Sequence, residues 1–208
     1  MSIKLKICGM KVPANIAEVI ALQPDYTGFI FYPGSKRFIA DPDPLLIRNI
    51  PAAIKTTGVF VNEELEKVKS AILKYDLKAV QLHGHESADY CAALKGHAEV
   101  IKAFGIDADF DFSKLDAYIA QVDYFLFDTQ TPDHGGSGKT FSWQLLKHYK
   151  NETPYFLSGG IGIEQLAELE NIKDERLYAI DVNSRFELSP GLKDIGLLRT
   201  CKLILAKI

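Results

Sequence analysis

Short, almost uninterrupted runs of apolar residues recur along the whole chain, and they give the first indication of its fold. Eight runs have the length and the β-branched or aromatic content of strands: residues 3–7, 27–31, 57–61, 79–82, 100–104, 124–127, 155–157 and 178–182. Most lack an apolar–polar alternation, which is typical of strands covered on both faces in a parallel sheet. The pattern therefore predicts a largely parallel sheet.

Segments whose apolar residues lie three or four positions apart separate these runs and predict helices. The clearest covers residues 62–75, where Leu65, Val68 and Ile72 share one face and Asn62 is the candidate N-cap. Residues 106–121 predict only a short helix after a loop. Further helical patterns cover residues 14–22, 41–48, 86–95, 141–149, 163–169 and about 195–207.

Eight strands that alternate with helices, without a long linker, are compatible with two α/β architectures. One is an open doubly wound sheet, and the other is a closed (β/α)₈ barrel, the TIM barrel. The strand count favours the barrel as a single domain over residues 1–208. This length is near the short end of the range for such barrels, so we expect short loops and at least one degenerate helix.

Composition and charge narrow the classes of function. The chain is 47% hydrophobic and carries a net charge of −3, so there is no positive excess for binding nucleic acid. No apolar stretch approaches ~18 residues, and lysines interrupt the apolar start, so we expect neither a membrane span nor a signal peptide. Three scattered cysteines (Cys8, Cys91 and Cys201) suit a reducing compartment, and a cytoplasmic location is expected.

In both architectures the chemistry collects at the C-terminal ends of the strands. Cys8 ends the first run and precedes Gly9, and a thiol there is either core filling or a nucleophile or general base. Asp128 directly follows Phe-Leu-Phe, so burial should raise the pKa of its carboxyl above ~3.9. Such a group either donates a proton near neutral pH or serves as a cap or an ion-pair partner.

Polar residues near two other strand ends suggest contacts with a ligand. Arg37 lies in a Gly/Ser loop, where it is either solvated or binds a carboxylate or phosphate through two hydrogen bonds. Gln81 and His83 are placed to supply hydrogen bonds at the floor and rim of a pocket. His83 and His85 lack an evident third ligand nearby, so no metal site is predicted.

The loops after the last two predicted strands indicate a phosphate site. Gly159 and Gly160 follow the seventh run, and Asn183 and Ser184 follow the eighth. In (β/α)₈ enzymes these two loops commonly hold phosphate through backbone N–H groups. Residues 133–140 match the end of a P-loop but lack its first glycine, so they are better explained as a flexible loop that covers a pocket or opens the following helix.

Considered jointly, these segments resemble the phosphoribosylanthranilate isomerase family of tryptophan biosynthesis. The matching segments, in the family's order, are residues 6–9, 35–38, 58–61, 80–84, 127–129, 135–141, 158–160 and 190–194. The resemblance implies a TIM barrel that uses no metal or organic cofactor. It also implies an Amadori rearrangement of N-(5-phosphoribosyl)anthranilate, a small phosphorylated substrate, to 1-(2-carboxyphenylamino)-1-deoxyribulose 5-phosphate. We expect a monomer or homodimer.

The resemblance also implies roles for individual residues. Cys8 matches the family's general base, Asp128 its general acid, and Arg37 the arginine that faces the anthranilate carboxylate. One stretch departs from the family's pattern, because Asn183 and the bulky Arg185 stand where the family usually has small residues. Arg185 either points outward or adds charge to the phosphate site.

Three other functions on the same scaffold remain as alternatives. An indole-glycerol-phosphate synthase needs a catalytic lysine at a strand end, for which Lys102 is the candidate. A pentose-phosphate epimerase needs metal ligands from several strands, and the sequence does not assemble them. A non-catalytic phosphate-ligand sensor would have no need of Cys8 and Asp128.

Overall fold

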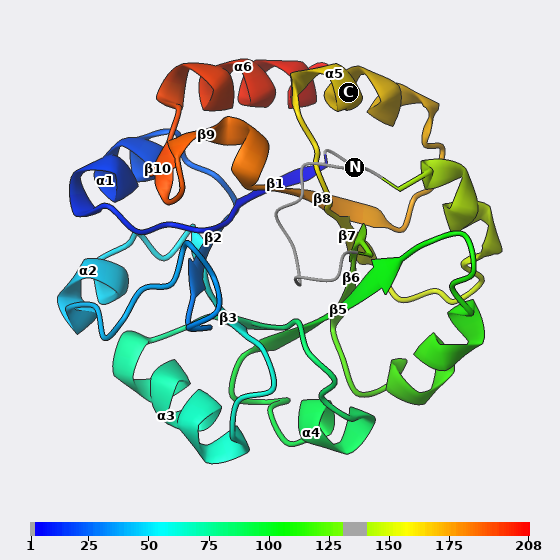
Figure 1. The fold of residues 1–208 in the computed structure, drawn as a ribbon, viewed down its shortest axis with the longest axis horizontal. Helices are drawn as coiled ribbons and strands as arrows, with labels where there is room; N and C mark the ends of the chain where they lie inside the picture. Colours follow the sequence, from blue (N-terminus) through cyan, green and yellow to red (C-terminus); the bar gives the residue numbers. More distant parts are fainter. Residues whose placement is uncertain (1–2, 131–140) are drawn as a thin grey trace.

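The computed structural model describes residues 3–130 and 141–208 and contains a closed barrel of eight parallel strands (Figure 1). All eight predicted strands are present, and the predicted TIM barrel is confirmed. The strands are β1 (Lys4–Ile7), β2 (Tyr26–Ile30), β3 (Lys55–Phe60), β4 (Ala79–Leu82), β5 (Glu99–Ile106), β6 (Tyr124–Thr129), β7 (Tyr155–Leu157) and β8 (Leu177–Val182). The glycine-rich segment 133–140 lies outside the described residues.

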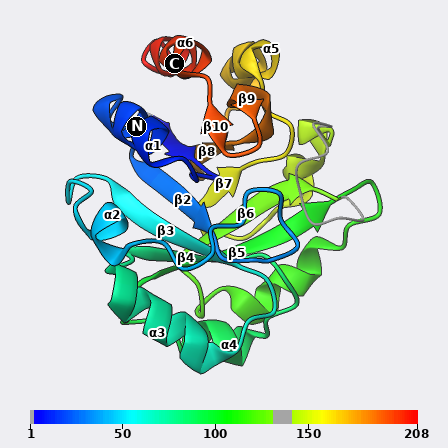
Figure 2. The same cartoon turned by 60° about the vertical axis from the view of Figure 1, so that its left-hand side comes forward.

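Helical segments surround the barrel and connect its strands (Figure 2). The α-helices are α1 (Pro13–Ala21), α2 (Pro44–Arg48), α3 (Leu65–Tyr75), α4 (Ala88–Ala92), α5 (Ile163–Leu166) and α6 (Ile195–Leu205). The 3₁₀ segments are η1 (Phe112–Tyr118), η2 (Trp143–His148), η3 (Ala167–Asn171) and η4 (Ser184–Phe186). The expected degenerate helices are therefore η1 and η2, and the α-helix predicted over residues 141–149 is a 3₁₀ helix instead.

Two predicted helix starts were wrong for the same physical reason. Asn62 does not cap α3, which begins after Glu64. Asn62 has a left-handed φ of +52°, and its side chain accepts a hydrogen bond from the N–H of His85 at 2.6 Å. The helix predicted from residue 86 begins at Ala88, with Ser87 as its N-cap. In both cases the polar side chain at the predicted start, Asn62 or Glu86, accepts a hydrogen bond from the loop after β4, and the helix begins later in the chain.

A short antiparallel hairpin follows β8 and was not predicted from the sequence. It consists of β9 (Glu187–Ser189) and β10 (Leu192–Lys193). Asn15 of α1 holds it, because its side chain donates to the carbonyl of Lys193 at 3.0 Å and accepts from the N–H of Lys193 at 2.6 Å. The hairpin is thereby attached to the first helix of the chain.

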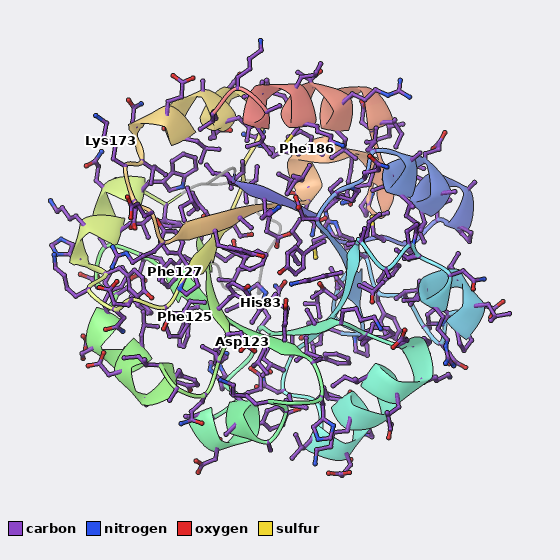
Figure 3. All side chains as sticks on the ribbon, turned by 180° about the vertical axis from the view of Figure 1, so that it is seen from behind. His83, Asp123, Phe125, Phe127, Lys173 and Phe186 are labelled. Carbon is purple, nitrogen blue, oxygen red and sulfur yellow. The ribbon has the colours of Figure 1, made fainter. Side chains whose placement is uncertain are left out.

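Alternate residues of each strand point into the barrel and out toward the helices, as the two-residue period of a strand requires. On β6, Phe125 and Phe127 belong to the main hydrophobic core between barrel and helices, whereas Leu126 packs inside the barrel. Figure 3 shows both phenylalanines on the outer side of β6 and His83 nearer the barrel axis. None of the described helices has the length and apolar character needed to cross a membrane.

Candidate active site

The alternation along the strands brings polar side chains together at the C-terminal end of the barrel. Ile7, Leu82, Phe127 and Val182 belong to the outer core, so the residues beside them face inward. The inward residues within the strands are Lys6 of β1, Gln81 of β4, Asp128 of β6 and Asp181 of β8. Those that directly follow a strand are Cys8 after β1, His83 after β4 and Asn183 after β8.

All the site residues predicted from the sequence line one pocket at this end of the barrel. They are Cys8, Arg37, Gln81, His83, Asp128, Gly159, Gly160, Asn183 and Ser184. The same pocket is lined by Asp181, Tyr32, Ser35 and Ser158, among others. A thiol and a carboxyl that are 120 positions apart in the sequence thus share one cavity.

Cys8 is a buried thiol between two lysines. Its side chain is accommodated by Gly28 of β2, where an added Cβ would lie 2.7 Å from Sγ. Burial raises the pKa of the Cys8 thiol, and the charge of Asp181 adds to this, whereas Lys6 and Lys193 lower it. Two cations that stabilise a thiolate are therefore present, but burial outweighs them and the free protein holds a protonated thiol at neutral pH.

Asp128 is a buried carboxyl whose pKa is raised to about 6. Burial is the main cause and confirms the effect predicted from Phe-Leu-Phe; the N–H of Thr129, 2.8 Å from Oδ1, and the charge of Lys6 oppose it. The backbone at Gly159 packs directly over this carboxyl with a φ of +91°, and an added Cβ there would lie 2.9 Å from Asp128 Oδ1. Glycine at this position therefore helps to exclude water from the carboxyl.

A chain of polar groups links Asp181 to Asp128 across the pocket floor. Lys6 Nζ lies 2.9 Å from Asp181 Oδ1 and donates to Gln81 Oε1 at 2.7 Å. Gln81 Nε2 lies 3.0 Å from His83 Nδ1, and His83 Nε2 lies 3.4 Å from Asp128 Oδ2. Burial acts to lower the pKa of Lys6, but the charge of Asp181 raises it overall, so the lysine is cationic.

Arg37 is fixed by the unpredicted hairpin. Its Nε and Nη2 donate to the carboxylate of Glu187 on β9 at 2.7–3.0 Å, and Lys193 donates to the same carboxylate at 2.7 Å. Burial acts to raise the pKa of Glu187, but these two cations hold it below its usual value. Gly9 makes room, since an added Cβ there would lie 2.6 Å from Arg37 Cδ. Nη1 has no hydrogen-bond partner among the described residues.

The loops after β7 and β8 present backbone donors to the pocket. Gly159 and Gly160 both have left-handed φ values, of +91° and +64°. Within residues 3–130 and 141–208, the N–H groups of Gly160, Asn183 and Ser184 donate to no protein acceptor. Arg185 is exposed to solvent.

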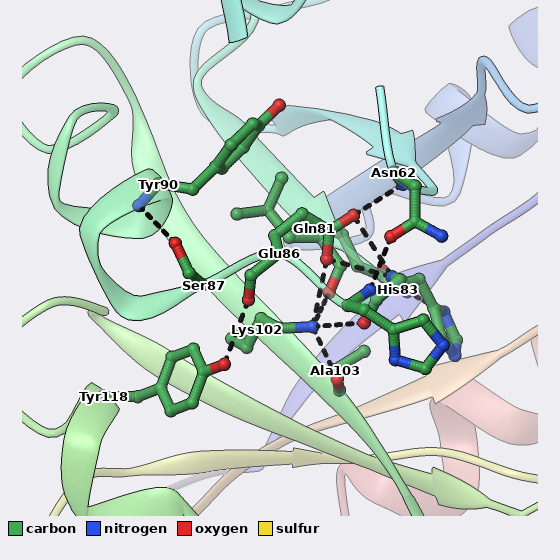
Figure 4. A network of polar contacts seen from close by, with 12 residues as sticks. Asn62, Gln81, His83, Glu86, Ser87, Tyr90, Lys102, Ala103 and Tyr118 are labelled. Carbon is green, nitrogen blue, oxygen red and sulfur yellow. Dashed lines mark hydrogen bonds and ion pairs between the residues drawn. The ribbon is translucent and has the colours of Figure 1, made fainter. Parts of the chain in front are cut away.

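Lys102 is a fully buried structural residue (Figure 4). Its ammonium group lies 3.0 Å from Glu86 Oε2 and donates to the carbonyls of Leu82, Gly84 and Ala103 at 2.8–3.2 Å. Glu86 in turn accepts from the N–H groups of Asn62 and Gly84. The ammonium group thus ties down the loop that carries His83, and it is not available for the role that a synthase would require.

Four charged residues of the site were not selected from the sequence: Lys6, Asp181, Glu187 and Lys193. A polar residue inside an apolar strand indicates a candidate site residue. This signal identified Gln81, and it also marks Lys6 and Asp181, which were not chosen. Lys193 lies within a matching segment of the family, whereas no sequence signal marks Glu187. In the described part of the chain, no group of three or more His, Cys, Asp or Glu residues is arranged to hold a metal ion.

Comparison with known proteins finds the same enzyme family in a family model, in a related sequence and in solved structures. Residues 5–202 match the family model described as N-(5′-phosphoribosyl)anthranilate (PRA) isomerase. The chain is 44% identical over 198 residues to N-(5′-phosphoribosyl)anthranilate isomerase of Parabacteroides distasonis, covering 94% of this chain and 90% of that protein. It matches the crystal structure of phosphoribosyl anthranilate isomerase from Thermotoga maritima with a TM-score of 0.86, 34% identity and coverage of 99% and 100% of the two chains.

A further similar structure contains a ligand. It is a phosphoribosyl anthranilate isomerase in complex with reduced 1-(o-carboxyphenylamino)-1-deoxyribulose 5-phosphate. The TM-score is 0.82 at 30% identity, and the match covers 99% of this chain and 100% of that one. The relatives therefore agree in fold over nearly the full length of this chain.

Proposed function

Because the chain belongs to the N-(5′-phosphoribosyl)anthranilate isomerase family and has that family's activity, we propose that Asp128 is its general acid and Cys8 its general base. The observation that carries this assignment is that both groups line one pocket, where Asp128 has a pKa of about 6. General acids work best with a pKa near the operating pH. An ordinary, solvated aspartate would be almost fully ionised there.

The reaction begins with a proton transfer from Asp128. Opening the ribose ring requires a proton on the ring oxygen, and Asp128 Oδ is the donor. The C1–O bond breaks, the nitrogen lone pair forms a C1=N bond, and a cationic iminium remains. The carboxylate left behind is accommodated because the charge of Lys6 and the N–H of Thr129 stabilise its ionised form.

The second proton transfer is assigned to Cys8. The iminium makes the C2 proton acidic, so a modest base removes it, and the product is an enolamine that tautomerises to the ketone. The free protein holds this thiol protonated, so its proton must first pass to solvent as the substrate binds. A cationic iminium beside the sulfur, together with Lys6 and Lys193, favours the thiolate at the step that uses it.

The two ends of the substrate are assigned to opposite sides of the pocket. The Nη1 side of Arg37 faces the anthranilate carboxylate while Glu187 holds the other side of the guanidinium. The phosphate is held by the backbone N–H groups of two loops. One contains Gly159 and Gly160, and the other contains Asn183 and Ser184. All these groups come from one chain, so none of them requires a second subunit.

A fluorescence assay that follows the disappearance of phosphoribosylanthranilate tests the assignment. Asp128→Asn should lower kcat by about 10²-fold or more, the usual contribution of a general acid. The matched control is Asp123→Asn, directly before β6 at its opposite end, where the carboxylate accepts a hydrogen bond from the N–H of Val100 and lies 3.8 Å from Lys95 Nζ. The control should keep kcat within about twofold. An Asp128→Asn enzyme with the kcat of the wild type would refute the proposal.

A further inference from the structure

His83 lies between the buried cation Lys6 and the carboxyl of Asp128, and its surroundings fix which of its nitrogens carries a proton. Gln81 is the connecting residue, with Oε1 at 2.7 Å from Lys6 Nζ and Nε2 at 3.0 Å from His83 Nδ1. An ammonium group only donates hydrogen bonds. The amide oxygen must therefore face Lys6, because the reversed amide would place two donors against each other.

The orientation of the amide determines the state of the imidazole. The NH₂ group of Gln81 is a donor only, so His83 Nδ1 has to accept and cannot carry a proton. A neutral imidazole then has its proton on Nε2, the nitrogen that lies 3.4 Å from Asp128 Oδ2. A doubly protonated imidazolium would place an Nδ1–H against the amide NH₂. Lys6 prevents the amide from turning to relieve that contact.

We propose that Lys6, acting through Gln81, holds His83 as the neutral Nε2–H tautomer, so that the imidazole cannot take the proton of Asp128. Lys6 and Gln81 are thus positioning residues for the acid, and this inference rests on the acid role proposed for Asp128. A free imidazole has an ordinary pKa of about 6.5, similar to that of this carboxyl. With a bare Nε2 facing the carboxyl, the pair would exist largely as imidazolium and carboxylate, and the acid would be lost.

The other charges that the described residues place around the imidazole act in the same direction or are already paired. Lys6 on β1 is cationic and disfavours a second cation at His83. Asp181 on β8 favours an imidazolium, but its carboxylate forms an ion pair with Lys6 at 2.9 Å. Cys8, after β1, carries a protonated thiol in the free protein. Asp128 on β6 is the carboxyl whose proton is at issue.

The tautomer can be measured directly without turnover. Protein labelled with ¹⁵N-histidine gives long-range ¹H–¹⁵N correlations that distinguish Nδ1–H, Nε2–H and imidazolium forms, and His83→Asn assigns the His83 signals. The wild type should show His83 as Nε2–H at pH 7 and keep this form when the pH is lowered to 5. An Nδ1–H or imidazolium form of His83 at pH 7 would overturn the proposal.

Two substitutions of Gln81 test the connection to Lys6. Gln81→Glu keeps the acceptor for Lys6 but replaces the donor facing Nδ1 with an acceptor, so His83 should become imidazolium at pH 7 and kcat should fall by about 10²-fold. Gln81→Met has neither group and should give a mixture of tautomers. Unchanged His83 signals in both variants would contradict the role of Gln81. Because the spectra require no catalysis, failure of the acid role of Asp128 would show in the activity assay alone.

Discussion

Asp128→Asn should stabilise the protein at high pH although it lowers kcat by about 10²-fold or more. The carboxyl is 7% exposed, and its pKa of about 6 lies above the ordinary value of 3.8. The folded chain therefore binds this proton more tightly than the unfolded chain does. The stability that the protonated carboxyl contributes is present below about pH 4 and is lost as the pH rises through about 6. Asparagine has no such ionisation.

The size of the effect follows from the shift. A rise of about two pKa units corresponds to roughly 3 kcal/mol at a pH well above both values. Near pH 4 most of this cost has disappeared, so the difference in unfolding free energy between variant and wild type should grow by about 2 kcal/mol from pH 4 to pH 8. The new amide also faces the backbone N–H of Thr129, which does not titrate, so that contribution is the same at both pH values and cancels in the comparison.

Urea denaturation of both proteins at pH 4, 6 and 8, followed by circular dichroism, measures this difference. Equal slopes in urea for the two proteins would show that the unfolded states are comparable. The expected outcome is a variant that gains stability relative to the wild type with rising pH, with the steepest change between about pH 4 and pH 6. A difference that does not depend on pH would refute the claim that burial raises the pKa of Asp128.

Three further substitutions test other parts of the site. Cys8→Ser should lower kcat by about 10²-fold or more while the affinity for a reduced product analogue, measured by calorimetry, stays unchanged; equal loss of affinity would contradict a base role. Arg37→Ala should raise KM by about 30-fold, because a charge-assisted contact of about 2 kcal/mol is removed; an unchanged KM would argue against the carboxylate contact. Lys102→Met should reduce the unfolding free energy by about 3–5 kcal/mol, because the carboxylate of Glu86 is left buried without its counter-ion. Adding Glu86→Gln should recover part of this loss, and urea denaturation of both variants measures it; a double variant no more stable than Lys102→Met would contradict the reasoning.

The barrel was predictable because most of its strands are buried on both faces and are therefore nearly continuous apolar runs. The site was largely predictable for a related reason. Parallel strands in a closed barrel bring their C-terminal ends together, so Cys8 and Asp128 were expected to meet even though nothing local connects them.

The errors arise where long-range contacts override local preference. Asn62 has the chemistry of an N-cap, but its hydrogen bonds to His85 and Glu86 hold it in a left-handed conformation ahead of the helix. Likewise, Lys6 and Asp181 each interrupt an apolar run, and only the pairing of the first strand with the last shows that they neutralise each other. Glu187 is brought to Arg37 and Lys193 by a hairpin too short to be recognised in the sequence.

The seam between β1 and β8, where Lys6 and Asp181 are register partners, has a consequence for biosynthesis. A ribosome releases Lys6 175 residues before Asp181, so until β8 emerges the lysine lacks this counter-ion. Burying it would then carry the cost of an unpaired charge. The nascent chain should therefore keep its first strand hydrated, and the barrel, with its catalytic groups, should assemble only after the eighth strand has left the exit tunnel.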